Sequence, residues 1–432
     1  MSITIRSCLV LAVLATGCMK TSATYCAKHG ADDPENCPPV DAPVATTCTS
    51  NTDCADSPAT LVCNTGTQVC VECNLASSQT GACNGFEPVC GADDACRGCR
   101  AHTECLSGAC LPDGSCGTDD NVAFVDGQLG TGGECTRAAP CSKLADALAK
   151  LPRRDFIKIK GTVDENVTIS GRDVTLLADP GARISKGSGR VLLVEGTSNV
   201  TVYDLQIGSA TSSSQIGVEL APTATGTTAL HRVRVVNTTQ GAINALGGKL
   251  VLERSTIADN DGGGVIVRTG ALEFTIRNNF ILFNGRATGT SSTPFGGVLI
   301  EKDSGTSAVE FNTIAYNESN GLQNRAGLAC FGSANAAGGN LVYGNREGIA
   351  AATDLTQVGG NCQTGNTFAA GAGDLGFANP STSTFDPHLT ATSPATVLDA
   401  GGACAARVPA DIDGNARPSG AACDLGADEL AP

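Results

Sequence analysis

The residues of this chain that could do chemistry begin with two carboxylates. Asp259 and Asp261 flank Asn260 and are the best local acidic pair. A glycoside hydrolase needs two carboxylates, one on each side of the bond that it cleaves. Both aspartates occupy a predicted turn, so solvated turn residues are the favoured interpretation and no catalytic residue is assigned.

A second candidate is Asp411-Ile-Asp-Gly-Asn415, which has the composition of the first part of a calcium loop. An EF-hand requires glycine at position six and glutamate at position twelve of that loop. Those positions hold Ala416 and Ala422, so a β-turn is the better interpretation. We expect no metal site and no cofactor.

Two Cys-x-x-Cys pairs, Cys70/Cys73 and Cys96/Cys99, could bind zinc or carry out redox chemistry in a reducing compartment. They lie in a dense group, since residues 26–116 hold 14 of the 22 cysteines and few large apolar residues. Such a segment cannot stabilise itself by burial, and disulfides are the usual substitute. We predict a disulfide array at residues 48–117 with its connectivity left open.

The N-terminus supports an oxidising location. Arg6 precedes an apolar run from Leu9 to Ala15, which is the order of a secretory signal and is too short to span a bilayer. Gly17-Cys18 resembles the cleavage site of bacterial lipoproteins, although Ala15 replaces the usual leucine. That resemblance implies a signal peptide at residues 1–17, a lipid on Cys18, a linker over residues 18–47, and Met19 as an outer-membrane sorting residue.

Ordinary signal-peptidase cleavage is the alternative to a lipid on Cys18, and cysteine parity favours the lipid. Removing Cys8 with the signal and Cys18 to the lipid leaves 20 cysteines, which can all pair. The formal charge of −15 argues against nucleic acid as a partner.

After Gly117 the composition changes to Gly, Asn, Thr, Val and Ile. Cys135 and Cys141 bracket a short loop and are expected to form a disulfide. The apolar spacing within Ser142–Leu151 predicts an amphipathic helix. From Phe156 onward, short alternating runs separated by Gly, Asp or Ser predict strands.

A longer repeat runs through these strands. An apolar residue is followed three positions later by asparagine and then by glycine, at Ile257/Asn260/Gly263, Ile281/Asn284/Gly296, Ile314/Asn317/Gly321 and Val342/Asn345/Gly348. A weaker copy is Val235/Asn237/Gly241, and alternating pairs precede the anchors at Leu250/Leu252, Phe274/Ile276 and Val309/Phe311. Repeats of this length made of strands indicate a solenoid with stacked asparagines and with glycine at a left-handed turn. A β-sandwich is the structural alternative, but it does not predict the in-register Asn/Gly pair.

Residues 121–430 resemble the right-handed parallel β-helix proteins of the pectate-lyase-like superfamily. GTVDENVTISGRDVTLLADPGARI is similar to their entry coils, and DIDGNARPSGAACDLGADEL to a tail of the choice-of-anchor type. The resemblance implies an all-β, right-handed parallel β-helix at residues 121–432, with the preceding helix as its N-terminal cap. Within it we expect disulfides between Cys404 and Cys423, locking the C-terminal cap, and between Cys330 and Cys362, joining neighbouring coils.

Lyases of this fold use acidic residues to bind calcium and an arginine or lysine as base. The charged residues on neighbouring predicted coils are Glu253, Arg254, Arg268, Glu273, Arg277 and Glu301, and solvated strand faces explain them equally well. Phe283 and Tyr316 precede two of the repeat asparagines, with Tyr343 nearby, and are interpreted as stacked rings that support a bend.

Together these features predict a lipid-anchored protein of the outer membrane or cell surface that displays a non-catalytic β-helix. Its expected partners are the membrane, through the lipid, and an extracellular glycan or protein. A polysaccharide lyase or other carbohydrate-active enzyme is the first alternative, and a purely structural spacer is the second.

Overall fold

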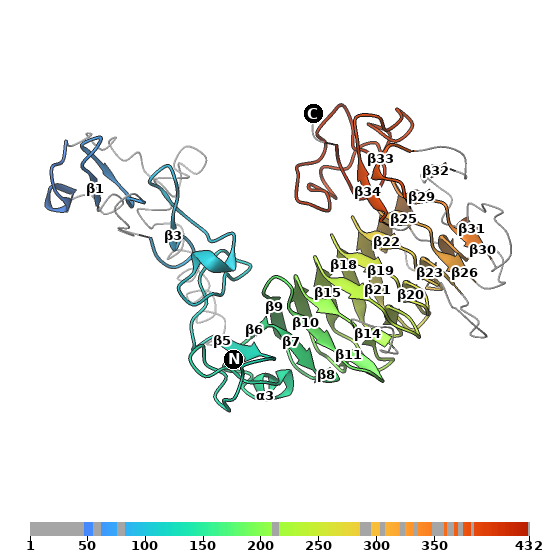
Figure 1. Cartoon of the computed structure of the whole chain (residues 1–432), viewed down its shortest axis with the longest axis horizontal. Helices are drawn as coiled ribbons and strands as arrows, with labels where there is room; N and C mark the ends of the chain where they lie inside the picture. Colours follow the sequence, from blue (N-terminus) through green and yellow to red (C-terminus); the bar gives the residue numbers. More distant parts are fainter. Residues whose placement is uncertain are drawn as a thin grey trace, which may run out of the picture. The chain divides into compact units, whose positions relative to one another are not determined.

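The computed structural model describes residues 47–54, 62–75, 83–209, 216–285, 295–302, 307–319, 325–331, 336–347, 358–360, 367–369, 375–381 and 384–430. The chain divides into two compact units, Met1–Thr118 and Asp119–Pro432 (Figure 1). Cys18, the predicted signal peptide and most of the predicted linker lie outside the described residues. Among the helices of the described part, none has the length and hydropathy needed to cross a bilayer.

The first unit is built from very short elements: η1 (Asn51–Cys54), β1 (Val62–Asn64), β2 (Val69–Val71), β3 (Val89–Cys90), β4 (Cys96–Arg97) and η2 (His102–Glu104). Six disulfides join them, namely Cys48–Cys63, Cys54–Cys70, Cys73–Cys90, Cys83–Cys96, Cys99–Cys110 and Cys105–Cys116. Three modules of four cysteines each therefore share one connectivity, first to third and second to fourth.

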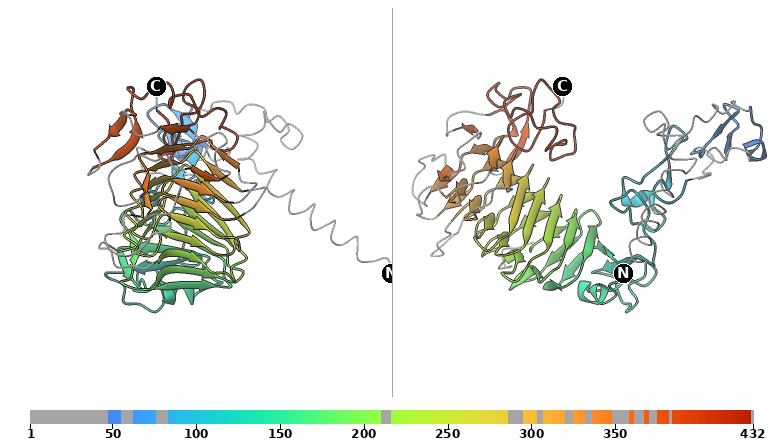
Figure 2. Two further views of the ribbon diagram at one scale, coloured as in Figure 1. Left: turned by 90° about the vertical axis from the view of Figure 1, so that its right-hand side faces the viewer. Right: turned by 180° about the vertical axis from the view of Figure 1, so that it is seen from behind.

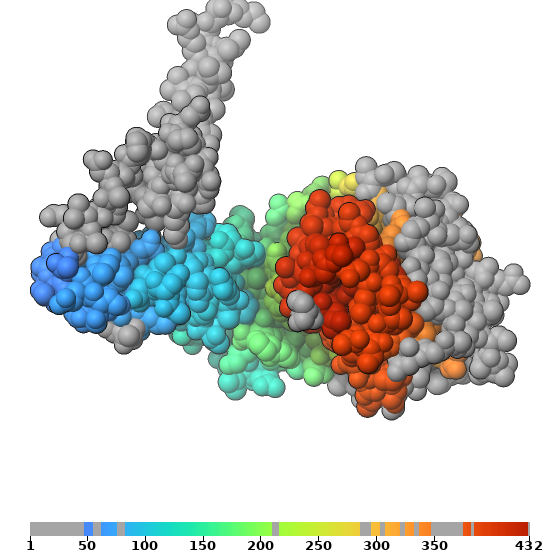
Figure 3. Space-filling model, turned by 90° about the horizontal axis from the view of Figure 1, so that it is seen from above, coloured from blue at the N-terminus to red at the C-terminus, as the bar shows by residue number. Residues whose placement is uncertain are grey.

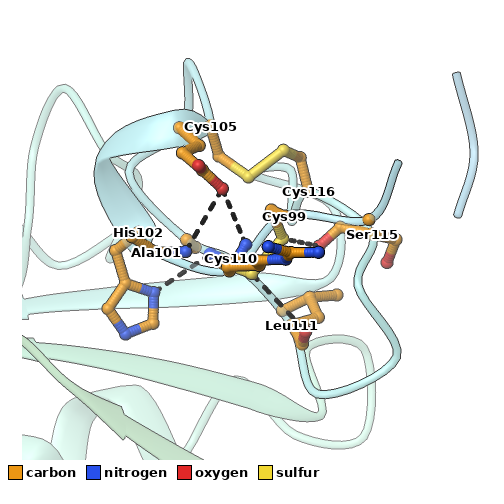
Figure 4. Close-up of a disulfide and its surroundings, with 12 residues drawn as sticks. Cys99, Ala101, His102, Cys105, Cys110, Leu111, Ser115 and Cys116 are labelled. Carbon is orange, nitrogen blue, oxygen red and sulfur yellow. Dashed lines mark hydrogen bonds between the residues drawn. A yellow bond between two sulfur atoms is a disulfide. The ribbon is translucent and has the colours of Figure 1, made fainter. Parts of the chain in front are cut away.

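The same geometry recurs in each module. The third and fourth cysteines lie opposite each other on antiparallel backbone, as Cys63/Cys70, Cys90/Cys96 and Cys110/Cys116. In the third module, the backbone N–H of Cys110 also donates to Nδ1 of His102, 3.0 Å away (Figure 4). Both Cys-x-x-Cys pairs are junctions, because each joins the last cysteine of one module to the first of the next. The disulfide interpretation of these pairs is confirmed.

The second unit is a solenoid of three parallel sheets (Figures 1 and 2). The first sheet contains β5 (Val122–Asp126), β6 (Phe156–Lys160), β9 (Val174–Ala178), β12 (Val200–Tyr203), β15 (Thr227–His231), β18 (Lys249–Glu253), β21 (Glu273–Arg277), β24 (Ala308–Glu310) and β28 (Ala336–Gly338). The second contains β7 (Thr162–Asp164), β10 (Arg183–Ser185), β13 (Gln206–Ile207), β16 (Arg234–Val236), β19 (Thr256–Ala258), β22 (Phe280–Leu282), β25 (Thr313–Ala315), β29 (Leu341–Tyr343) and β32 (Thr367–Ala369). The third contains β8 (Val167–Ser170), β11 (Arg190–Glu195), β14 (Ile216–Leu220), β17 (Ile243–Ala245), β20 (Val265–Val267), β23 (Val298–Ile300), β27 (Leu328–Cys330) and β31 (Val358–Gly360).

Two further pairs complete the unit, the parallel pair β26 (Glu318–Ser319) and β30 (Arg346–Glu347), and the antiparallel hairpin β33 (Phe377–Asn379) and β34 (Asp386–Leu389). Inward-facing aliphatic side chains of the three sheets form one continuous core, which includes Ile157, Leu176, Val202 and Ile257. Because side chains alternate between faces along a strand, the alternating runs seen in the sequence place one row inward on every coil.

The predicted helix Ser142–Leu151 is present but shorter, as α3 (Leu144–Leu148). Leu144, Ala147 and Leu148 are buried in the core, as the spacing requires. After Leu148 the hydrogen bonds span three residues instead of four, since the backbone N–H groups of Lys150 and Leu151 donate to the carbonyls of Ala147 and Leu148. Pro152 then ends the segment. The carboxylate of Glu165 accepts the backbone N–H of Leu144 at the other end.

The asparagine repeat forms the predicted stack. In successive coils the amide nitrogen Nδ2 donates to the next Oδ1 at 2.8 Å for Asn260–Asn284, 2.9 Å for Asn284–Asn317 and 2.9 Å for Asn317–Asn345. The second Nδ2 hydrogen reaches a strand carbonyl of a neighbouring coil, as from Asn284 to Ile257. All four asparagines are buried and hydrogen-bonded, which is the condition under which a buried amide stabilises a fold.

The glycine part of that prediction needs correction. The left-handed residue of each repeat is the one just before the asparagine, with φ of 56° at Asp259, 55° at Phe283 and 55° at Tyr316. Gly263 does have φ of 98°, but at Gly296 the constraint is a close approach, because a Cβ would lie 2.3 Å from the carbonyl oxygen of Ala326. Gly321 and Gly348 lie outside the described residues.

Two other predicted alignments are also wrong. The anchors Ile257, Ile281, Ile314 and Val342 are in register, but in the preceding sheet the partner of Ile276 is Val309, so Phe311 lies beyond the strand. Asn237 is not a rung either. Thr238 takes that place, its hydroxyl donating to Oδ1 of Asn260 at 2.8 Å.

The C-terminal tail, residues 390–430, packs on the coils and forms the continuous red surface in Figure 3. Its centre is Arg417, which is completely buried. The guanidinium donates to Glu429 at 2.9 Å and to Asn278 on the solenoid at 2.8 Å, and it lies 4.8 Å from the ring centroid of Phe311. The tail therefore folds around one buried cation.

Candidate functional site

A group of polar side chains gathers where the first sheet bends into the second. Tyr203, His231 and Glu253 end three consecutive strands and are register partners across β12, β15 and β18. The residue after each is left-handed, with φ of 61° at Asp204, 53° at Arg232 and 52° at Arg254. We call these side chains the first-bend cluster: Tyr203, Asp204, His231, Arg232, Glu253 and Arg254.

The geometry of the cluster is set by the stacking of coils. The rings of Tyr203 and His231 are stacked, with centroids 5.0 Å apart and planes 17° apart. The guanidinium of Arg232 lies 5.3 Å from the Tyr203 centroid and donates two hydrogen bonds to Asp204, at 2.6 and 2.8 Å. Arg232 is therefore fixed in orientation by a bidentate pair.

His231 and Glu253 form the part of the cluster that could move a proton. Nδ1 of His231 lies 3.5 Å from a carboxylate oxygen of Glu253. Burial lowers the pKa of His231, with the Glu253 charge opposing that shift, so the imidazole is neutral at physiological pH. Burial also raises the pKa of Tyr203, which keeps its phenol protonated. A neutral imidazole beside a carboxylate can accept a proton, and an arginine is a strong hydrogen-bond donor to carboxylates such as those of anionic sugars.

The charged residues singled out from the sequence do not meet at one place. Glu253 and Arg254 belong to the first-bend cluster. Arg277 is the register partner of Glu253, but it pairs with the buried Glu310 at 3.0 Å. Glu273 pairs with Lys249 at 2.8 Å, at the opposite end of the same strands.

Arg268 and Glu301 form their own ion pair at 2.7 Å, beside the third sheet. Each of these pairs joins one coil to the next, as expected of charged side chains in register on stacked strands. The predicted charged stripe is thus divided among several separate ion pairs.

The acidic candidates act within turns. Asp259 holds the left-handed position of the second bend, where the second sheet turns into the third, and it is exposed. Asp261 is half-buried, and its pKa is raised first by burial and then by the charge of Asp259. In the closing tail, Oδ1 of the buried Asp411 accepts the backbone N–H groups of Asp413, Gly414 and Asn415 at 3.0, 2.7 and 2.8 Å. That carboxylate organises its own turn, in agreement with the β-turn interpretation.

Two of the three disulfides predicted in the solenoid lie entirely within the described residues. Cys135 is bonded to Cys141, and Cys404 to Cys423, as predicted. Cys330 is disulfide-bonded, but Cys362 lies outside the described residues.

The predicted aromatic stack is present at the second bend. The rings of Phe283 and Tyr316 are 5.4 Å apart with planes at 4°, and Tyr343 meets Tyr316 edge-on at 5.6 Å. Phe385 of the hairpin contacts both stacked rings from the side. The rings therefore support a bend and attach the hairpin.

Sequence reasoning missed two features. Tyr203, His231 and their neighbours could have been found from the two polar residues that end each alternating run, in the segments VYD, LHR and LER. A second ladder, Asn279–Asn312–Asn340, has Nδ2-to-Oδ1 distances of 2.9 Å at both steps and begins at Ser255. Its signal was an asparagine five residues before each of the last three predicted rungs.

One comparison with known proteins agrees with the stacked-coil geometry of the second unit. A family model described as a right-handed β-helix region matches residues 190–369. This region is a right-handed β-helix. No curated protein matches the chain. The solved structure of pectate lyase Pel9A is similar at 14% identity, with a TM-score of 0.45 and coverage of 72% of this chain and 97% of that one.

Proposed function

We propose that the protein is a lipid-anchored display scaffold of the outer membrane or cell surface. In this proposal Cys18 carries the lipid, residues 18–47 are a linker, and the β-helix presents a non-catalytic surface to an extracellular glycan or protein. Helix α3 closes the first coil, where its apolar face already lies in the core.

The observation that carries this proposal is the pairing of charged side chains between coils. Ion pairs join neighbouring coils along the solenoid at Lys186–Asp164, Arg190–Glu219, Arg232–Asp204, Lys249–Glu273, Arg268–Glu301, Arg277–Glu310 and Arg346–Glu318. Each exposed pair contributes little stability by itself, roughly 0–1 kcal/mol. Together they hold side chains in fixed rows on an ordered backbone, which suits a preorganised binding surface.

The anchor is tested by replacing Cys18→Ser and fractionating the cells. We expect the wild-type protein in the membrane fraction, with a mature mass that includes the lipid, and the variant in the soluble fraction. Membrane retention of the variant would contradict the anchor. It would leave the binding role to be tested separately.

Binding is tested with the purified mature protein on an array of acidic and neutral glycans. Tyr203→Ala and Arg232→Ala remove the ring and the cation of the first-bend cluster. Arg268→Ala is the matched control, because it removes an arginine from an inter-coil pair beside another sheet. We expect the two cluster variants to lose binding to acidic glycans and the control to retain it. Equal binding by all three variants would exclude the cluster as the binding surface.

A carbohydrate-active enzyme is the second candidate, favoured by His231 beside Glu253 next to two arginines. Its test is incubation with uronate polymers, followed by ultraviolet absorbance of the unsaturated product that a lyase releases. Product formed by the wild-type protein and lost in His231→Ala would replace the display function with catalysis. A wild-type protein that binds acidic glycans without releasing product would support display.

A further inference from the structure

We propose that His388, Asp413 and Asp428 bind a divalent cation of the Zn²⁺ type, which fastens the β33–β34 hairpin to the closing tail. The three ligands come from separate segments, His388 from β34, Asp413 from the Asp411 turn and Asp428 from the end of the tail. This site does not depend on the display function proposed above.

The distances fit one ion. One ligand atom from each residue can be chosen such that all three lie within 4.8 Å of one another. Nε2 of His388 is 3.1 Å from Oδ2 of Asp413. Two ligands bound to one Zn²⁺ at about 2.1 Å in tetrahedral geometry lie about 3.4 Å apart, so small side-chain adjustments are sufficient.

The imidazole is already oriented as a metal ligand. Nδ1 of His388 contacts the carboxylate of Asp386, which leaves Nε2 directed at Asp413. A carboxylate on the far nitrogen of a histidine fixes its tautomer and raises its basicity in metal sites. The ring is also held from the solenoid by Phe280, whose centroid lies 5.1 Å away in an edge-on contact.

Asp428 is held toward the same point. It is only 6% exposed, and its Oδ2 accepts the backbone N–H of Leu389, the residue after His388, at 2.6 Å. That bond uses one oxygen lone pair and leaves the rest of the carboxylate available, because a carboxylate has about four acceptor positions.

Charge is the independent reason to expect a cation. Asp386, Asp413 and Asp428 surround a single imidazole, so the group remains negative even when His388 is protonated. Arg254 donates to the carbonyl of Ile412 and its charge interacts with Asp413, so it offsets part of this excess, while Arg417 pairs with Glu429. A divalent ion would neutralise this excess, and a mixed imidazole and carboxylate set favours zinc over calcium.

The experiment uses the purified mature chain with its disulfides formed, stripped with a chelator and titrated calorimetrically with ZnCl₂, MnCl₂ or CaCl₂. We expect saturable binding of one Zn²⁺ per chain, verified by elemental analysis, and weaker binding of the other two ions. His388→Gln and Asp413→Asn should abolish saturable binding. Asp386→Asn should weaken it about 10- to 100-fold, because it alters only the orienting carboxylate.

Two controls match the chemistry of these variants. His231→Gln removes another histidine that lies beside a carboxylate, and Glu301→Gln removes another paired carboxylate. Both should bind Zn²⁺ as the wild-type protein does. Asp413 is exposed, so its variant tests the site even if His388→Gln perturbs the hairpin. An ion-pair cluster only, with no saturable Zn²⁺ binding by the wild-type protein, would overturn the proposal, as would unchanged binding by Asp413→Asn.

Discussion

The two units of this chain are stabilised in opposite ways. In the described part of the first unit, the buried apolar residues other than cysteine are Val62, Ala109 and Leu111. Three repeated four-cysteine modules hold its hairpins together. The second unit has a continuous aliphatic core and two asparagine ladders, and its two fully described disulfides, Cys135–Cys141 and Cys404–Cys423, lie toward its ends.

This difference shows how a repeat can be stabilised either covalently or by register. A disulfide stabilises mainly by restricting the unfolded chain, typically by about 2–4 kcal/mol. An asparagine ladder works only in the folded state, because each amide needs the coil on either side. The array should therefore depend on redox state, and the solenoid on the integrity of neighbouring coils.

The largest effect should come from reduction. Treatment with dithiothreitol followed by alkylation should unfold the array and leave the solenoid folded, because only the array lacks an apolar core. Limited proteolysis with mass mapping should show cleavage within residues 48–117 and a surviving fragment that begins near residue 119. The non-reduced protein is the control. Equal digestion of both units after reduction would show that the solenoid also depends on its disulfides.

The next effect concerns the closing tail. Arg417→Met removes a completely buried cation and leaves the Glu429 carboxylate without it. Breaking one side of a buried ion pair costs about 3–5 kcal/mol. We expect a loss of this size in denaturant unfolding of the solenoid unit. Arg407→Met is the matched control, because Arg407 also pairs with a buried glutamate, Glu310, but is half exposed. A smaller loss for Arg417→Met than for this control would contradict the central role of Arg417.

Breaking a ladder should cost less. Asn284→Ala removes a middle rung and leaves polar groups of two neighbouring coils unsatisfied, at about 1–3 kcal/mol. Thr238→Val, at the end of the same ladder, should cost less because it has a rung on one side only. Thermal unfolding of both variants measures the difference. If Asn166→Ala, at an exposed asparagine outside both ladders, were as destabilising as Asn284→Ala, the ladder would have no special role.

Much of the solenoid could be predicted because its signals are local and periodic. The anchors Ile257, Ile281, Ile314 and Val342 recur with their asparagines, and the structure places them in register. The second ladder carries the same signal, since Ile276 and Val309 precede Asn279 and Asn312 by three residues and are register partners, so it could have been predicted from the same spacing. Phe311 was wrongly aligned with Ile276 because it continues the apolar alternation of the strand before it, although it lies at the bend beyond that strand.

The sites that depend on distant residues could not be predicted in this way. Arg417 donates to Asn278, 139 residues earlier, and the candidate zinc ligands His388, Asp413 and Asp428 follow no metal-binding motif. The disulfide connectivity could not be predicted from the sequence either, because four cysteines allow three pairings in each module. The Cys-x-x-Cys spacing marked the module junctions, but only the folded hairpins show this.

The smallest predicted effect returns to the array and separates it from the solenoid by pH. Arg97 donates to Glu104 at 2.7 Å, and backbone N–H groups of Arg100 and Ala101 add to the same carboxylate, so the pKa of Glu104 is lowered from 4.5 to about 2. Because the folded pKa is below the unfolded value, this stabilisation is present above pH 4.5 and is lost as the pH falls toward about 2. In Glu104→Gln that part of the pH dependence should disappear.

Hydrogen exchange of residues 99–116, measured between pH 5 and pH 2 with correction for intrinsic rates, is the appropriate readout because the six disulfides prevent global unfolding of the array. We expect protection to fall with pH in the wild-type protein and to be low and nearly constant in the variant. Glu301→Gln, in an exposed ion pair of the solenoid, should leave the protection of residues 99–116 unchanged. An identical pH profile for the wild-type protein and Glu104→Gln would show that the disulfides alone order the third module. The array would then be stabilised by covalent bonds alone and the solenoid by its core and ladders, which would sharpen the contrast between the two units.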